Sequence, residues 1–441
     1  MKNIDLVIKG GLICTMNSKR DLKVNSSIAI HQGKILAIND SNLIAEIYTS
    51  NTEIDGTDSI VMPGLINTHT HSALSFLRGI CDDLNLMDWL KNYVWPLEKN
   101  FIDEVFVYHA TKLAIHEMLQ SGTTTFNDSY FYSREVARAA SEMGIRCIAG
   151  ELVFTSPSPI GQNSQKTFSY IQENFEEWRG SKLISISLSP HSLYACSPDL
   201  IKKAHAYSSR NNALMNILVS ESQREVADIQ ALYGDTPIGV LDKLGVLNER
   251  LIATHCVQVT NSDMERIASN NVGISHNPES NMKLGNGVAP IISLLKLGIN
   301  VGLGTDGAAS NNDLSLFSEI DFAVKLQKGY NRDATVFNSL QAVEMLTINA
   351  AKVLNLQDQI GSFEVGKCAD LILIDCKNSH STPLYNPYSH IVYAARSSDV
   401  STVIIDGKVL VDNKILLNSD FEAIREVSNN YSRKIKAYLK L

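Results

Sequence analysis

The pattern of hydrophobic and polar positions changes twice along the chain, near residue 60 and near residue 365. At both ends, short segments such as DLVIKGGLICTM and SIAIHQGKILAI alternate β-branched and polar residues between glycine-containing breaks, as short strands do. The same texture returns in ADLILID (369–375) and in STVIIDGKVLVDN (401–413), where Asp406-Gly407 predicts a hairpin turn. Two β-rich ends around a different middle predict one small β domain assembled from residues 1–59 and 366–441.

The middle of the chain, residues 60–365, contains apolar, strand-like runs that are separated mostly by helical patterns. Near-continuous apolar strands alternating with helices are typical of a parallel sheet that is covered on its faces. Eight such units predict a (β/α)8 barrel. The runs lie at 60–66, 123–127, 145–150, 183–189, 214–220, 251–255, 272–276 and 299–305, and helix candidates between them include 103–120, 133–144 and 197–212.

Polar residues follow the predicted strands in a regular way. In a barrel of parallel strands the active site lies at the carboxyl ends of the strands. Each predicted strand delivers a potential ligand, acid or hydrogen-bonding group to this rim, which scattered surface residues would not do. These residues are His69 and His71, Asn127 and Asp128, Glu151, His191, Glu221, His255, His276 and Asn277, and Asp306.

The segment NTHTH (67–71) places two histidines at alternate positions on the first strand of the barrel. Together with Asp306 on the last strand, His69 and His71 make a nitrogen–oxygen site that suits a divalent metal such as zinc. Such a metal lowers the pKa of a bound water from 15.7 to about 7, and Asp306 could act as the general base. Without the aspartate, two ordinary strand-end histidines would be an equal alternative.

Composition and net charge limit which binding partners and which cellular compartment the sequence indicates. The net charge of −8 indicates no basic face for nucleic acid, and no run reaches the roughly 18 apolar residues of a membrane span. The N-terminus MKNIDLVIKGG does not resemble a signal peptide. Seven dispersed cysteines predict free thiols and a cytoplasmic protein, and the lack of any CxxC excludes a cytidine-deaminase-type zinc site.

Four longer motifs resemble the amidohydrolase superfamily: VMPGLINTHTH (61–71), HNPESNMKLGNG (276–287), GLGTDGAASNN (302–312) and GSFEVGKCADLILID (361–375). Segments 76–98 and 189–197 are similar, more narrowly, to its methylthioadenosine/S-adenosylhomocysteine deaminase and chlorohydrolase branch. The resemblance covers essentially the whole chain. It implies a (β/α)8 TIM-like barrel (60–365), a composite β-sandwich (1–59 and 366–441, with a terminal helix), one divalent metal and a homo-oligomer.

The resemblance also implies the roles of the catalytic residues. His69, His71 and Asp306 match the metal ligands, and Asp306 is also the base. Glu221 matches the acid that protonates a ring nitrogen of the substrate. His255 matches the histidine that positions the attacking water.

Three further residues match positions that contact substrate in the family. Glu98 matches a carboxylate that grips ribose hydroxyls, and His191 matches a histidine that contacts the nucleoside. Taken alone, Glu98 could be a surface acid and His191 a structural histidine. Glu151 stands where the family carries an arginine for an anionic substrate tail, which argues against S-adenosylhomocysteine as substrate. The alternative is a local shift of the alignment that involves Arg146.

One expected metal ligand is missing. The family's fifth strand ends in His-x-x-Glu, and the matching residues here run from Leu218 to Glu221 within LVSESQREV. Leucine has no donor atom, so three outcomes stay open. The metal binds through His69, His71 and Asp306 with His255 or water completing the shell, the chemistry has changed, or the site is empty.

The first hypothesis is therefore a metal-dependent amidohydrolase, a hydrolase of C–N bonds other than peptide bonds. It would deaminate an adenosine-like or other amino-substituted nitrogen heterocycle with zinc, or iron or manganese, as cofactor. The alternative is a diverged relative with a weakened or empty metal site, either an isomerase or cyclase or a protein that binds a nucleoside-like ligand. Both predict a small-molecule partner, without nucleic acid or membrane.

Overall fold

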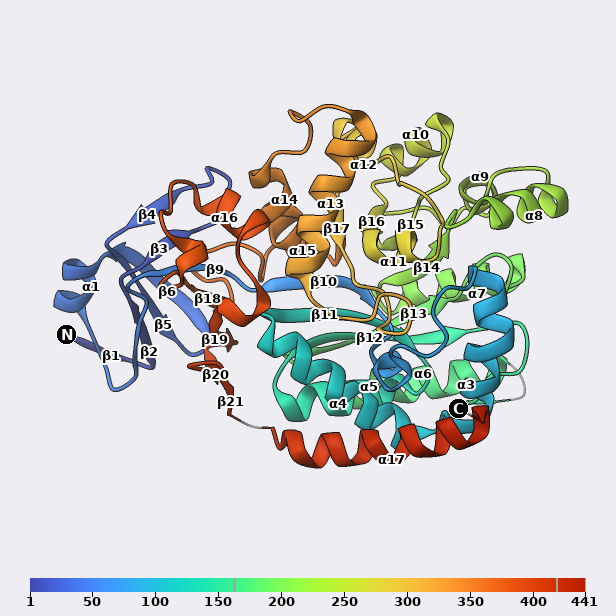
Figure 1. Cartoon of the computed structure of the whole chain (residues 1–441), viewed down its shortest axis with the longest axis horizontal. Helices are drawn as coiled ribbons and strands as arrows, with labels where there is room; N and C mark the ends of the chain where they lie inside the picture. The colour runs from blue at the N-terminus through green and yellow to red at the C-terminus, as the bar shows by residue number, and fades with distance from the viewer. Residues whose placement is uncertain (162–163, 418, 441) are drawn as a thin grey trace.

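The protein is described by a computed structural model over residues 1–161, 164–417 and 419–440. Its largest element is an eight-stranded parallel sheet in which β10 to β17 follow one another in chain order (Figure 1). The strands are β10 (Leu65–Thr70), β11 (Thr123–Tyr130), β12 (Arg146–Val153), β13 (Ile184–Pro190), β14 (Met215–Val219), β15 (Leu251–His255), β16 (Gly273–His276) and β17 (Val301–Leu303).

Hydrogen bonds between the first and last strands close this sheet. The Asp306 amide donates to the His69 carbonyl at 3.1 Å, and the Thr68 hydroxyl donates to the Leu303 carbonyl at 2.9 Å. The predicted (β/α)8 barrel is therefore confirmed.

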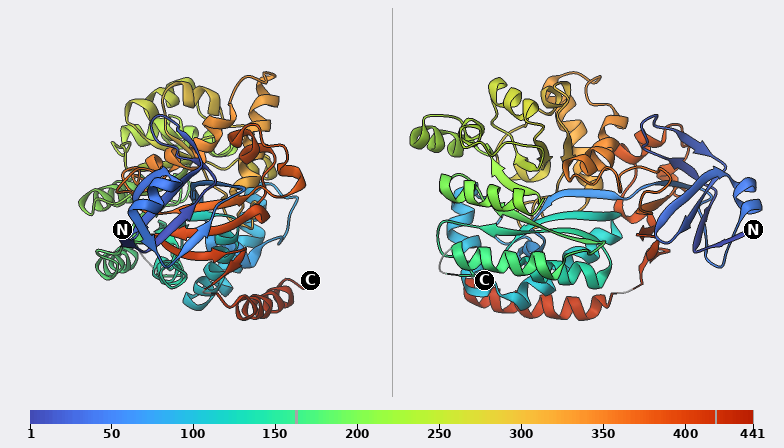
Figure 2. Two further views of the ribbon diagram at one scale, coloured as in Figure 1. Left: turned by 90° about the vertical axis from the view of Figure 1, so that its left-hand side faces the viewer. Right: turned by 180° about the vertical axis from the view of Figure 1, so that it is seen from behind.

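Helices cover the outside of the barrel (Figures 1 and 2). The predicted helices correspond to α4 (Glu104–Gln120), α5 (Ser133–Met143) and α7 (Pro198–Arg210). Among the described residues, none of the helices is long and apolar enough to cross a membrane. The remaining helices of the barrel are α2 (Leu86–Trp89), α3 (Trp95–Phe101), α6 (Ser164–Glu177), α8 (Gln223–Tyr233), α9 (Pro237–Lys243), α10 (Asn261–Ser269), α11 (Pro278–Lys283), α12 (Ile291–Lys296), α13 (Leu316–Asn331), α14 (Ser339–Leu346) and α15 (Ile348–Val353), with the short η1 (Ser72–Leu77) and η2 (Leu90–Val94).

The small domain is a sandwich built from both ends of the chain. One sheet has the order β21-β20-β19-β18-β9-β3-β4 and the other β6-β5-β2-β8, while β1 pairs with β7. Their facing side chains form a separate apolar core that includes Ile8, Ile28, Val61, Leu371 and Ile404. C-terminal β18 pairs with N-terminal β9, so both chain ends complete one sheet and the predicted composite sandwich is confirmed.

The elements of this part of the chain have the following bounds. The strands are β1 (Lys2–Ile4), β2 (Leu6–Lys9), β3 (Leu12–Cys14), β4 (Leu22–Val24), β5 (Ser26–His31), β6 (Lys34–Asp40), β7 (Tyr48–Ser50), β8 (Glu53–Asp55), β9 (Ser59–Pro63), β18 (Leu371–Asp375), β19 (Val400–Ile405), β20 (Lys408–Asp412) and β21 (Ile415–Leu416). The helices are α1 (Ser41–Ile47), η3 (Ser379–Ser381), α16 (Pro387–Tyr393), η4 (Ser397–Asp399) and α17 (Phe421–Leu439).

The apolar run at 60–66, predicted as one strand, is divided between the two domains. Its first part belongs to β9 of the sandwich, and β10 of the barrel begins at Leu65. Gly64 lies at the junction, where a Cβ atom would overlap the side chain of Thr124. The prediction of one continuous strand was wrong because both parts are buried, so hydrophobicity does not change where the chain passes between domains.

The terminal helix α17 lies along the outside of the barrel, away from the sandwich (Figures 1 and 2). The Tyr431 ring packs edge-on against Phe106 of α4, with ring centroids 5.0 Å apart, and also contacts Phe76. The C-terminal segment thus supplies strands to one domain and a helix to the surface of the other.

A buried ion pair joins the barrel to the sandwich. Arg146, at the start of β12, donates to both carboxylate oxygens of Asp370 at 2.9 and 3.1 Å, and both side chains are buried. Asp370 also accepts a hydrogen bond from the Asp406 amide at 2.8 Å. Arg146 is therefore committed to the domain junction, at the opposite end of β12 from the rim, which excludes it as a substrate-binding arginine.

We expect Arg146→Met to destabilise the fold by about 3–5 kcal/mol, because it leaves the buried Asp370 carboxylate without its cation. Urea unfolding followed by circular dichroism would measure the loss. Arg425→Met is the matched control, since Arg425 pairs with Glu422 on the exposed surface of α17 and should change stability by less than about 0.5 kcal/mol. Equal urea midpoints for the two variants would contradict a stabilising role of the buried pair.

Candidate active site

A cavity of about 60 Å³ lies at the carboxyl ends of the barrel strands. Most of the predicted site residues line it: His71, Glu98, His191, Glu221, His255 and Asp306, together with Leu218. An apolar cover formed by α2, η2 and α3 closes one side with Leu86, Trp89, Leu90, Val94 and Trp95. The fold therefore brings residues at the carboxyl ends of β10, β13, β14, β15 and β17 to one place.

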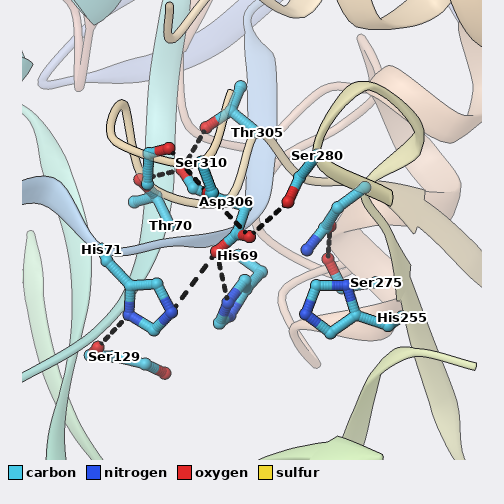
Figure 3. A network of polar contacts seen from close by, with 12 residues as sticks. His69, Thr70, His71, Ser129, His255, Ser275, Ser280, Thr305, Asp306 and Ser310 are labelled. Carbon is cyan, nitrogen blue, oxygen red and sulfur yellow. Dashed lines mark hydrogen bonds and ion pairs between the residues drawn. The ribbon is translucent and has the colours of Figure 1, made fainter. Parts of the chain in front are cut away.

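His69, His71 and Asp306 form a compact set of donors (Figure 3). The Asp306 Oδ1 atom lies 3.5 Å from His69 Nε2 and 3.3 Å from His71 Nε2. One donor atom from each residue lies within 4.8 Å of the others, close enough for one ion to contact all three. The histidines share a face because side chains alternate along β10, and the Thr70 hydroxyl instead donates to the Asp306 carbonyl at 2.9 Å.

Hydrogen bonds to neighbouring residues orient these donors. His71 Nδ1 donates to the Ser129 carbonyl, which can only accept, so His71 Nε2 keeps its lone pair. The hydroxyls of Ser280 and Ser310 donate to Asp306 Oδ2 at 2.6 and 2.9 Å and leave Oδ1 facing the histidines (Figure 3). Both serines belong to motifs noted in the sequence, but a motif alone does not show which of its polar residues contacts the aspartate.

The donor set fits a divalent metal. Both ring nitrogens of His69 are buried without a hydrogen-bond partner among the described residues, although buried polar atoms almost always have one. Burial lowers the pKa of His69 to about 4, so at neutral pH its imidazole is in the uncharged form that binds metals. Burial opposes ionisation of Asp306, but its close contact with His69 and the charges of the neighbouring imidazoles hold its pKa well below the usual range. A metal at this point would contact two neutral imidazoles and one carboxylate.

Glu221 and His255 form a second polar pair in the same cavity. Glu221 Oε2 lies 3.9 Å from His255 Nε2, and its Oε1 accepts a hydrogen bond from Asn286 at 2.8 Å. His255 Nδ1 donates to Asn281 Oδ1 at 2.8 Å, which directs Nε2 into the cavity. Burial raises the pKa of Glu221. Burial alone would lower the pKa of His255, but the negative charges of Glu221 and Asp306 outweigh it, and the pKa of His255 is raised. Glu221 is thereby suited to carry and donate a proton.

Leu218 faces the same cavity from β14. Its amide donates to the His191 carbonyl at 3.0 Å, so the backbone at this position is held to the neighbouring strand end. The position expected to carry a third histidine ligand therefore turns an apolar side chain toward the site.

Glu98 and His191 lie on the wall of the cavity. Glu98, on α3, accepts a hydrogen bond from the Tyr130 hydroxyl at 2.7 Å, and burial raises its pKa to about 7. The His191 ring packs against that of Phe154, with ring centroids 5.0 Å apart. Burial lowers the pKa of His191 to about 3. Tyr130 was missed in the sequence because its strand extends three residues beyond the predicted run at 123–127.

Glu151 does not reach the cavity. Its Oε2 accepts a hydrogen bond at 2.7 Å from the amide of Ser133, the first residue of α5, and burial raises the pKa of Glu151 to about 8. Leu152, the next residue of β12, lines the cavity instead. Other polar residues of the predicted rim are also buried outside the cavity lining: Asn127, Asp128, His276 and Asn277.

Comparison with known proteins identifies the family. Residues 60–410 match the amidohydrolase family. The chain belongs to this amidohydrolase family. A 5-methylthioadenosine/S-adenosylhomocysteine deaminase from Syntrophus aciditrophicus is 40% identical over 440 residues, which cover 100% of this amidohydrolase and 99% of the relative. A 5'-deoxyadenosine deaminase from Methanothermobacter thermautotrophicus is 39% identical over 392 residues, 87% and 90% of the two chains.

A solved structure supports the same assignment. A zinc-bound adenosine deaminase from Xanthomonas campestris has a TM-score of 0.97 and 33% identity to this amidohydrolase, with 99% of each chain covered. The predicted superfamily and its deaminase branch are thus confirmed. So is the predicted class of enzyme, a hydrolase related to adenosine-type deaminases. Zinc is recorded for that relative, and a His-His-Asp cluster is present in this chain.

We expect Leu218→His to tighten metal binding by at least about tenfold, because it adds an imidazole beside the three existing donors. Elemental analysis after dialysis against a weak chelator would measure zinc retention. Leu218→Met is the matched control, since it keeps an apolar side chain of similar volume and should retain metal like the parent protein. Equal retention by the histidine variant and the control would show that position 218 cannot reach the ion.

Proposed function

We propose that this protein is a metal-dependent amidohydrolase that removes the exocyclic amine of adenosine-type nucleosides and releases ammonia. The observation that carries the proposal is a cluster of His69, His71 and Asp306 next to Glu221 and His255, with all of these residues except the fully buried His69 lining one cavity. Relatives named as deaminases of methylthioadenosine and 5'-deoxyadenosine support a nucleoside substrate. Zinc is the proposed ion, with iron and manganese as alternatives, and when bound it would activate water at neutral pH.

The residues of the cavity supply the proton transfers that deamination needs. Glu221, with its raised pKa, donates a proton to the ring nitrogen next to the carbon that bears the amine. Asp306, which stays ionised, accepts a proton from the attacking water, and His255 holds that water by its free Nε2. The proton taken up by Asp306 then passes to the amine, which leaves as ammonia, while the hydroxyl proton returns to Glu221 and the water oxygen stays on the ring as a carbonyl.

The walls of the cavity favour a nucleoside with a small, uncharged substituent. Among the described residues that line it there is no arginine or lysine to pair with an anionic tail. This lack of a cation, rather than the carboxylate of Glu151, now argues against S-adenosylhomocysteine. Leu86, Trp89 and Leu90 instead present apolar surface, which suits a methylthio or deoxy group.

The cover must move to admit substrate. Sites for small molecules usually enclose roughly 300–1,000 Å³, whereas this cavity measures about 60 Å³. The small volume supports entry of a nucleoside by an outward shift of α2 and η2, whose return would exclude water from the reaction.

The leucine at position 218 supports a second candidate function, a protein that binds nucleosides without hydrolysing them. The retained buried polar groups at Glu221, His255 and Asp306 favour the enzyme, since unused ionisable groups are costly to bury. The two functions differ in one measurable product, ammonia.

Ammonia release from 5'-deoxyadenosine, methylthioadenosine, adenosine and S-adenosylhomocysteine tests the proposal with zinc-loaded protein. We expect turnover of the first three, and Glu221→Gln should lower kcat by about 10²–10⁴ while leaving zinc content unchanged, because it removes the acid but no metal donor. Full zinc occupancy with nucleoside binding but no ammonia would overturn the enzyme and favour the binding protein.

The raised pKa of Glu98 predicts a pH dependence of substrate binding. The carboxyl is protonated below its pKa of about 7 and ionised above it, and only the ionised form accepts two hydroxyl hydrogen bonds without donating. We expect KM for adenosine to fall as pH rises from about 6 to about 8. Glu98→Gln should flatten the profile.

Two controls separate this effect from general pH sensitivity. Tyr130→Phe removes the hydrogen bond that lowers the pKa of Glu98, so the midpoint of the KM profile should move to higher pH. With 2',3'-dideoxyadenosine, which lacks the ribose hydroxyls, KM should depend little on pH. An unchanged profile in Glu98→Gln would contradict the assigned contact.

A further inference from the structure

A second cavity, of about 800 Å³, lies at the opposite end of the barrel from the active site. It opens at the amino ends of β13 and β14, where Ile184, Ile186 and Leu214 form its apolar floor. Its volume falls within the roughly 300–1,000 Å³ of small-molecule sites. Nothing in the proposed deamination uses this space.

Three arginines line this cavity, one before each of three successive strands. Arg179 precedes β13, Arg210 ends α7 before β14, and Arg250 directly precedes β15. Adjacent strands of a sheet lie about 4.8 Å apart, so the loops that enter them open side by side. The fold therefore gathers three guanidinium groups at one end of the barrel.

These arginines are largely without partners. In the described part of the chain, the side chains of Arg179 and Arg210 make no hydrogen bond or ion pair. Arg250 donates to Asn212 at 3.0 Å and lies 3.8 Å from Glu249, the single acidic residue of the lining. Arg146, before the preceding strand β12, is by contrast fully engaged with Asp370. In a chain of net charge −8, a cavity with three arginines and one acid is a local exception.

The rest of the lining suits an organic phosphate. Phe175 and Trp178, at the end of α6, supply aromatic surface, and the Trp178 Nε1 atom has no hydrogen-bond partner among the described residues. Side-chain amides of Asn211, Gln357 and Gln359 complete the wall. The planar guanidinium fork matches phosphate oxygens two at a time, and aromatic faces accept a flat base.

We propose that this arginine cavity binds a small phosphate-bearing anion. The ligand is distinct from the substrate, since β13 runs from Ile184 at the arginine cavity to Pro190, directly before His191 of the active site, and the described active-site lining holds no arginine or lysine. Phosphate-bearing ligands are thus directed to one end of the barrel and uncharged nucleosides to the other.

Calorimetric titration of the full chain with pyrophosphate and with ADP tests the proposal. We expect saturable binding at one site, and Arg179→Gln combined with Arg210→Gln should weaken it at least about tenfold because both exposed guanidinium groups are lost. The control is the double variant Arg425→Gln with Arg224→Gln. It removes the same charge from α17 and α8, outside the cavity lining, and should bind like the parent.

The two probes separate the possible ligands. Tighter binding of ADP, reduced by Trp178→Leu with no change for pyrophosphate, would assign the site to a nucleotide. Equal binding of both would assign it to the phosphate groups alone. Adenosine should bind the arginine variants and the parent equally, so failure of the proposed deaminase function would not affect the result. No saturable binding of either phosphate probe, or equal binding by the arginine variant, overturns the proposal.

Discussion

The junction between the first and last barrel strands is the constraint on which the site depends. The same residues close the barrel and form the metal-binding set, because the Asp306 amide bonds to the His69 carbonyl and the Thr70 hydroxyl to the Asp306 carbonyl. Asp306 adopts a left-handed backbone conformation with φ of +58°, which is unfavourable for a residue other than glycine. The contacts on both sides of the strand junction offset this strain, and they also fix where the buried carboxylate points.

Sequence patterns predicted the barrel well because each strand is a local apolar run and the rim follows from strand direction. They failed where hydrophobicity does not change, as at Gly64 between β9 and β10. The rim pattern also could not distinguish a polar residue that faces the cavity from one that forms a hydrogen bond with a buried backbone group. Glu151 and Glu221 each follow a predicted strand, but one accepts a hydrogen bond from the first residue of α5 and the other faces His255. Which face is turned inward depends on contacts between distant segments.

Leucine at position 218 affects the number of donor atoms available to a metal more than the arrangement of the other site residues. A third imidazole at this position would coordinate a bound ion, whereas with leucine only water or His255 could coordinate the ion from this side. Two of the three donor residues are nevertheless oriented by hydrogen bonds, Asp306 by the Ser280 and Ser310 hydroxyls and His71 by the Ser129 carbonyl. Leu218 is therefore the one position of the expected ligand set without a donor atom, and the functional question concerns metal affinity.

One end of the barrel has a cavity lined by acidic residues and the other a cavity lined by arginines. The distance between these cavities limits how strongly one can influence the other. β13 has seven residues, so at about 3.3 Å per residue the ends lie roughly 20 Å apart. At an effective dielectric constant of 20, a unit charge at that distance acts on the active site with only about 0.8 kcal/mol. Direct electrostatics from a phosphate in the arginine cavity would thus alter a rate by less than about fivefold per charge. A larger effect on catalysis would require β13 or β14 to move, carrying His191 or Glu221 with it.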